Sequence, residues 1–306
     1  MVSRFMKSHR AAIFQALFVV FLWATSWVFV KIGLKDIPPI TFAGLRYFFA
    51  FLFLVIGLLF SEAKYEIRKL SRRAWLRLTL LGILLYAATQ GAVFVTLDRL
   101  PAVTTNLLMS FSTIGVATLS VFWLHEKPTW MQWGGILLAL IGVMIYFMPV
   151  SIPQNQMIGV IAALFGVTTN VISSVLGREI NRAEAHHPLV VTVISMGAGS
   201  IILLLAGFGI EEPPTMTLQG WGIIVWLALV NTAFAFTLWN HTLRTLTATE
   251  SSVIGGTMMI WVPILAFLFI GENITGKEIL GLIITAAGTL IVQLRKFPSR
   301  VKASTT

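Results

Sequence analysis

The sequence contains no cysteine, and only 11% of its 306 residues carry a charge. The absence of cysteine excludes disulfides, thiolate catalysis and metal sites with thiolate ligands. In an ordinary soluble protein about 25% of the residues are charged. A chain with so few charged residues could not cover a surface that faces water, so the composition excludes that class. His, Asp and Glu nowhere have the spacing of metal ligands, and no Gly-x-x-x-x-Gly-Lys segment occurs. We therefore expect no metal, no cofactor and no hydrolysis of ATP by this chain.

Apolar residues dominate the chain instead: they make up 57% of it, and the mean hydropathy is +0.87. A helix needs about 20 apolar residues to cross a bilayer. Windows of that length predict an all-α, polytopic membrane protein with ten transmembrane helices. The predicted spans are residues 11–34, 39–60, 75–96, 101–124, 130–148, 157–178, 188–208, 218–242, 249–270 and 274–294.

The positive charges lie mainly in alternate connections between these spans. With the N-terminus in the cytoplasm, 17 of the 22 Lys and Arg residues lie inside, four lie outside, and one, Arg46, lies within a span. Cytoplasmic loops carry the excess of Lys and Arg in membrane proteins. We therefore expect a multi-pass protein of the inner (plasma) membrane with both termini in the cytoplasm. The net charge of +10 is then a topology signal with some affinity for anionic lipids, and we expect no nucleic acid partner.

The stretch from Trp75 to Ile145 recurs in the second half at a constant offset of 146 residues, without a gap. The matches least attributable to chance join Trp75 to Trp221, Glu126 to Glu272, Gly135 to Gly281 and Gly142 to Gly288. The duplication predicts two five-helix repeats, residues 11–148 and 157–294, between basic tails at 1–10 and 295–306. Because five is odd, the two repeats must cross the membrane in opposite senses. Inverted repeats of this kind are typical of transporters.

Four segments together resemble the EamA branch of the drug/metabolite transporter superfamily. They are residues 22–27 with the sequence LWATSW, residues 38–47 with PPITFAGLRY, residues 102–142, and the echo of the third segment at 248–288. The second half departs from the first, since it has no counterpart of Arg46 and has residues 166–170 in place of the stretch from Trp23 to Trp27. The resemblance implies a ten-helix exporter of small metabolites, among them amino acids and related solutes.

Arg46 is the one charged residue deep within a predicted span. It lies about seven residues into the second span, or roughly 10 Å deep at 1.5 Å per residue. A charge at that depth is costly and should face the helix bundle or water. We expect its guanidinium to line a cavity, where it binds a substrate carboxylate or gates the outer mouth. The alternative is a side chain that extends to the outer interface or binds helix carbonyls.

Further polar and aromatic residues lie within the spans, where amides and indoles usually face protein or water. The candidate substrate-binding residues besides Arg46 are Trp23, Trp27, Tyr86, Gln90, Asn106, Ser110, Asn170, Asn231, Thr257, Met258 and Trp261. The alternative for each is structural: the rings pack between helices, the amides join helices, and Ser110 bonds its own helix. Pro263 follows Trp261 closely and can kink the ninth span into a gate.

Small residues and two glutamates suggest roles away from the substrate. Glycines on one face of spans five and ten permit close contact, either within the chain or in a homodimer. We expect Glu126 and Glu272 to cap the helix that follows each of them, with proton coupling as the alternative. The whole pattern predicts a secondary active exporter that works by alternating access around a midplane site between spans one to four and six to nine. A passive facilitator or channel, and an enzyme embedded in the membrane, are the alternatives.

Overall fold

The computed structural model describes residues 2–123, 129–148, 154–182, 186–242, 245–246 and 254–293, and 87% of the structure is helix. The first half contains α1 (Val2–Gly33), α2 (Pro39–Leu59), α3 (Lys64–Ile67), α4 (Arg72–Gly82), the π-helix η1 (Ile83–Gln90), α5 (Gly91–Arg99), α6 (Ala102–Trp123) and α7 (Trp130–Phe147). The second contains the 3₁₀ turn η2 (Gln154–Gln156), α8 (Met157–Arg182), α9 (Pro188–Ile210), α10 (Leu218–Trp226), the π-helix η3 (Leu227–Phe234), α11 (Ala235–Thr242), α13 (Met258–Ile270) and α14 (Gly276–Gln293).

Six of the described helical segments are long and apolar enough to cross a membrane, and three more are apolar but shorter. Large apolar side chains such as Leu218 and Trp130, which is 91% exposed, cover the outside of the bundle. A soluble monomer rarely exposes so much apolar surface. The chain is therefore a multi-pass membrane protein. The number of ten spans and the inverted relation of the repeats stay predictions.

The helix termini follow ordinary capping chemistry. Pro39 begins α2, where a missing N–H costs nothing. Ser71 accepts a hydrogen bond at the start of α4, and Thr129 with Gln132 forms a capping box at the start of α7. Gly271 ends α13 with a φ of +73°, a conformation that glycine adopts without steric cost. The turn residues that separate the predicted spans thus also set where the helices begin and end.

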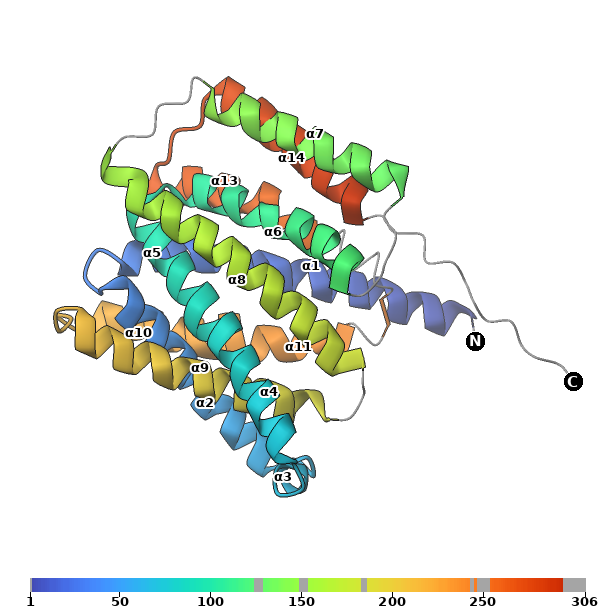
Figure 1. Ribbon diagram of the computed structural model, residues 1–306, viewed down its shortest axis with the longest axis vertical. Helices are drawn as coiled ribbons and strands as arrows, with labels where there is room; N and C mark the ends of the chain where they lie inside the picture. The colour runs from blue at the N-terminus through green and yellow to red at the C-terminus, as the bar shows by residue number, and fades with distance from the viewer. Residues whose placement is uncertain are drawn as a thin grey trace, which may run out of the picture.

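The helices of the two halves make matching contacts (Figure 1). α2 packs against α9, and α7 packs against α14 at one side of the bundle. α1 contacts α11 and α13 of the second half, while α8 contacts α5 and α6 of the first half. Each half therefore completes its packing with helices of the other.

The glycines predicted for packing or a homodimer lie between α7 and α14 of the same chain. A Cβ on Gly142 would lie 2.5 Å from the nitrogen of Thr285, and one on Gly281 would lie 2.8 Å from the carbonyl oxygen of Gly142. These contacts leave no room for a second chain on this face. Packing within the chain is what the structure shows for these glycines. A homodimer that uses other faces of α7 and α14 stays a prediction.

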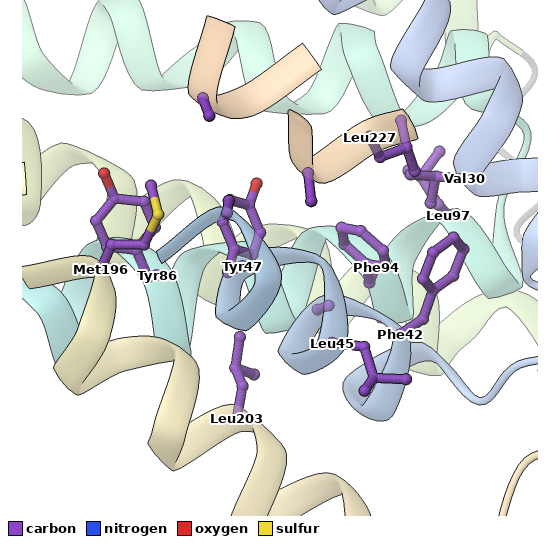
Figure 2. Packing of buried hydrophobic residues seen from close by; sticks show 14 of the residues in the cluster. Val30, Phe42, Leu45, Tyr47, Tyr86, Phe94, Leu97, Met196, Leu203 and Leu227 are labelled. Carbon is purple, nitrogen blue, oxygen red and sulfur yellow. The ribbon is translucent and has the colours of Figure 1, made fainter. Parts of the chain in front are cut away.

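Aromatic residues fill the centre of the main core (Figure 2). The rings of Phe42 and Phe94 meet edge to face at 5.2 Å, and those of Tyr47 and Tyr86 lie 5.5 Å apart. All four side chains are buried. Aromatic pairs at these distances add to the free energy of burial. This core lies beside the cavity described next and holds α2 against η1 and α5.

Candidate functional site

A cavity of about 380 Å³ lies between helices of both halves. Nine of the twelve residues predicted from the sequence line it: Trp23, Trp27, Arg46, Gln90, Asn106, Ser110, Asn170, Asn231 and Met258. The other described lining residues are Ser26, Val30, Tyr47, Thr89, Val93, Phe94, Leu97, Met109, Ser112, Thr113, Phe236, Gly255, Gly256, Met259 and Thr289. The cavity is within the size range of small-molecule sites, which combine apolar walls with a few polar groups.

Arg46 is buried against the cavity and does not extend to an interface, since it is only 7% exposed. Its Nε donates to the hydroxyl of Thr232 at 3.3 Å, and its guanidinium carbon lies 5.3 Å from the ring centre of Tyr47. The terminal nitrogens make no hydrogen bond or ion pair with any residue that the structure describes. The guanidinium thus has donors that remain for a ligand.

Two π-helices bring polar side chains to the cavity. Thr89 and Gln90 end η1, and Asn231 lies in η3. In both segments a threonine hydroxyl donates to a leucine carbonyl five residues earlier: Thr89 to Leu84 at 2.8 Å and Thr232 to Leu227 at 2.9 Å. Short π-helical segments within α-helices are frequent at functional sites. Apolar windows predict ordinary helices here and do not distinguish this feature.

Three polar atoms of cavity residues are buried without a partner among the described residues. They are Trp23 Nε1, Asn106 Nδ2 and Asn231 Oδ1. The Nδ2 of Asn231 does have partners, because it donates to Leu22 O and, at 3.1 Å, to the hydroxyl of Thr25. Asn231 therefore joins η3 to α1 through its amide nitrogen, while its oxygen is buried without a partner among the described residues. A buried polar atom without a partner is costly, so these atoms favour a polar ligand or water at this place.

The serine hydroxyls of the cavity are bonded to their own helices. Ser26 donates to Trp23 O at 2.6 Å, Ser110 to Leu107 O at 2.6 Å, and Ser112 to Met109 O at 2.7 Å. This is the structural alternative considered for Ser110, and it coexists with the position of Ser110 at the cavity wall. With their protons used in this way, the hydroxyls present lone pairs.

Three predicted residues are not among those that line the cavity. Tyr86 stacks behind Tyr47, and Thr257 precedes α13 and donates to Ile254 O at 2.6 Å. Trp261 meets Phe21 edge to face at 5.2 Å and packs in the contact of α1 with α13. All three were selected by type and depth, which do not determine the direction in which a side chain points.

The spacing of residues along a helix is a signal that was not used when the candidate residues were chosen by type and depth. Asn106, Ser110 and Thr113 follow one another at spacings of four and three, which places them on one face of a helix. Tyr47 and Thr89 also line the cavity, but the sequence distinguishes them only by their position next to the candidates Arg46 and Gln90. Among the described residues, no group of three or more His, Asp and Glu side chains could hold a metal ion.

Lys31 and Glu272 join the α5–α6 corner to other helices at the end of the cavity predicted to face outside. Lys31 Nζ donates to the carbonyls of Leu97 and, at 2.7 Å, Leu100. Glu272 accepts from the backbone nitrogens of Ala102 at 2.6 Å and Val103 at 3.1 Å. The predicted cap of the following helix is therefore wrong for Glu272, which caps α6 instead.

The start of α14 has a cap of its own. The side chains of Thr275 and Glu278 accept hydrogen bonds from each other's backbone nitrogens. A role for Glu272 at α14 is therefore not needed. Glu126 lies outside the described residues.

The matching family and the relatives named below are transporters. The model of the EamA-like transporter family matches residues 10–148 and again 157–294. The chain is 28% identical to the uncharacterized transporter YoaV of Bacillus subtilis (strain 168), over 88% of this chain and 92% of the relative. It is 24% identical to the uncharacterized inner membrane transporter YedA of Escherichia coli (strain K12), with 93% and 92% covered.

One relative has a substrate in its name. The S-adenosylmethionine/S-adenosylhomocysteine transporter of Chlamydia trachomatis serovar L2 is 24% identical, over 86% of this chain and 83% of its own. A solved crystal structure matches with a TM-score of 0.66 at 15% identity, over 92% of this chain and 97% of that one. This last likeness concerns the fold alone.

Proposed function

The chain belongs to the EamA-like transporter family, and from this premise we propose that it is a secondary active transporter that exports a small metabolite. Its relatives are named as transporters and not as enzymes. The observation that carries the proposal is the central cavity, which takes residues from both halves and contains a buried arginine. Two related halves that rock around such a site give alternating access.

The proposed architecture is ten spans in two inverted five-helix repeats with both termini in the cytoplasm. The matching contacts of the two halves and the paired π-helices support it. Labelling of single cysteines tests the orientation directly, because the chain has no native cysteine. Lys69 and Asn155 are both exposed. We expect an impermeant thiol reagent to label Asn155→Cys and not Lys69→Cys in intact cells, and the reverse pattern would reject the proposed topology.

The substrate we propose carries a carboxylate, as an amino acid or a related solute does. Arg46 would bind the carboxylate with its terminal nitrogens, in the two-pronged geometry that guanidinium and carboxylate share. Gln90, Asn106, Asn170 and Asn231 would bind the remaining polar groups, and the aromatic residues would contact the apolar part. The name of the Chlamydia relative does not determine the substrate of this chain.

Flux from proteoliposomes tests the function even while the substrate is unidentified. Vesicles with purified protein are loaded with a defined mixture of metabolites, and the released compounds are measured by mass spectrometry with and without a proton gradient. We expect release of one class of compound against its own concentration gradient when an ion gradient drives it, with the proton gradient tested first. Release that only equilibrates would favour the passive facilitator. Equal release from vesicles with Arg46→Ala would exclude the proposed site.

A further inference from the structure

The charge of the cavity is unbalanced among the described residues. Arg46 contributes one positive charge, and no Asp or Glu is among the lining residues that the structure describes. Within the described part of the chain, its guanidinium contacts the neutral side chains of Thr232 and Tyr47. A positive charge held away from water needs a negative partner or continued hydration. When a substrate displaces water from the cavity, a carboxylate of the substrate can supply that partner.

The orphan polar atoms favour a substrate with several oxygens. Trp23 Nε1 and Asn106 Nδ2 are donors without an acceptor among the described residues. Both residues line the same cavity as Arg46, so these donors and the terminal nitrogens of Arg46 belong to one wall and lack an acceptor within the described part of the chain. The acceptors on the described lining side chains are neutral: the amide oxygens of Gln90, Asn106, Asn170 and Asn231, and the hydroxyl lone pairs. Such acceptors suit a hydroxyl group, whereas an ammonium that leaves water is better balanced by a carboxylate.

The walls between these polar atoms are apolar and aromatic. Trp27, Phe94 and Phe236 line the cavity together with Val30 and Met259. A ring or a branched aliphatic group would be well accommodated there. The substrate should therefore combine one anionic end with an apolar body.

From these observations we infer that the cavity selects an organic monoanion, a hydroxy or other carboxylic acid without an ammonium group, over the corresponding amino acid and over amines. The inference rests on the proposed function and narrows its substrate class. Counted over the described lining residues, a bound monoanion cancels the charge of Arg46 and leaves a net charge of zero. A zwitterion leaves the net charge at +1, and a cation raises it to +2.

Three compounds with one carbon skeleton separate these classes. They are L-3-phenyllactate, which is a monoanion, L-phenylalanine, which has an ammonium in place of the hydroxyl, and L-phenylalaninol, which is a cation with no carboxylate. Binding to the purified full-length protein is measured by calorimetry and by thermal shift, because a ligand raises stability with its concentration relative to Kd. We expect phenyllactate to bind about tenfold or more tightly than phenylalanine, and phenylalaninol not to bind.

Two arginine substitutions connect this preference to the cavity. Arg46→Gln should weaken phenyllactate binding about tenfold or more and remove the preference over phenylalanine. Arg46→Lys keeps the charge and should retain part of the preference. Arg77→Gln is the matched control, because Arg77 pairs with Glu179 at 2.5 Å and is not a lining residue of the cavity. It should leave all three affinities unchanged.

The outcomes separate this inference from the proposed function. Phenylalanine binding as tightly as phenyllactate, or phenylalaninol binding most tightly, would overturn the selection of monoanions and leave a transporter of another substrate class. A failure of all three compounds to bind the wild-type protein would also overturn it, while the proteoliposome experiment would still decide whether the protein transports. The affinities for the three compounds are compared in the wild-type protein, so this test does not depend on whether the Arg46 variants fold.

Discussion

Helix α2 of the first half and helix α9 of the second half both begin with a proline, Pro39 and Pro188. Seven residues after that proline, α2 has Arg46 and α9 has Ser195. Both helices pack against the π-helix of the opposite half, α2 against η3 and α9 against η1. Arg46 reaches Thr232 of η3 and faces the cavity. Ser195 is buried, donates to Val191 O of its own helix at 2.7 Å, and lies against the backbone of Gly82. Two positions at the same distance from the first proline of their helices thus have opposite uses in the two halves.

Small residues allow α9 to pack closely against α4 and η1. A Cβ on Gly82 would collide with the backbone of Ser195, and a Cβ on Gly199 would lie 2.6 Å from the Cβ of Tyr86. The chain therefore approaches itself closely on this side. Where α2 meets η3, Arg46 and Asn231 line the cavity, and Arg46 bonds to Thr232. The duplication supplies the scaffold twice, but it places the charge in one half and tight packing in the other.

The largest effect should come from removing the charge on the α2 side. Arg46→Ala should lower transport efficiency about tenfold to a hundredfold, because a hydrogen bond to a charged group contributes about 1.5–3 kcal/mol. Ser195→Ala is the matched change on the α9 side and should have little effect, since its hydroxyl bonds its own helix. Initial rates in proteoliposomes measure both. Equal losses in the two variants would break the comparison.

Tight packing on the α9 side should make stability there sensitive to one methyl group. Gly82→Ala should lower the free energy of unfolding by about 1–3 kcal/mol through overpacking. Gly222→Ala, in α10 of the other half, should leave stability unchanged or slightly raised, because nothing lies within 4 Å of the added Cβ. Thermal unfolding in detergent measures the difference. A neutral Gly82→Ala would mean that α9 and the end of α4 do not approach as closely as described.

The two π-helices should differ in how their amides act. Asn231 bonds Leu22 and Thr25 of α1, whereas Gln90 makes no side-chain hydrogen bond with a described residue. Asn231→Ala should therefore lower stability by about 1–2 kcal/mol, and Gln90→Ala should leave stability unchanged and weaken apparent substrate affinity by up to about tenfold. Thermal unfolding and transport kinetics are measured for both. A stability loss in Gln90→Ala alone would reverse the assignment.

The smallest effects should come from two glutamates that cap distant helices. Glu211 accepts from Ile40 N at 2.8 Å and Thr41 N at 2.7 Å at the start of α2, as Glu272 does at the start of α6. Glu211→Gln and Glu272→Gln should each lower stability by about 0.5–1 kcal/mol, because an amide keeps one acceptor and loses the charge that favours a helix N-terminus. Thermal unfolding of both variants shows whether the two caps are equivalent.

Much of the candidate site was predictable because intramembrane polar residues are few and expensive. Arg46, Asn106 and Asn231 needed partners, and nine of the twelve candidates lie at one cavity. Trp261 was predicted by the same reasoning and packs against Phe21 instead, because an indole is equally suited to a helix contact. Thr89 could not be predicted, since a threonine in a helix satisfies its hydroxyl with its own backbone.

The sequence by itself determined that the chain crosses a membrane, that it is duplicated, and that its intramembrane charge lies in one half. These are properties of composition and order, and they do not depend on how side chains meet. Only the tertiary structure decided which polar residues face the cavity and which helix each glutamate caps. Each backbone hydrogen bond in a π-helix spans one residue more than in an α-helix, which changes the residues that share a face. Glu272 caps α6, about 170 residues away in the chain. The free backbone N–H groups of a helix N-terminus can donate to any carboxylate that tertiary packing brings near them.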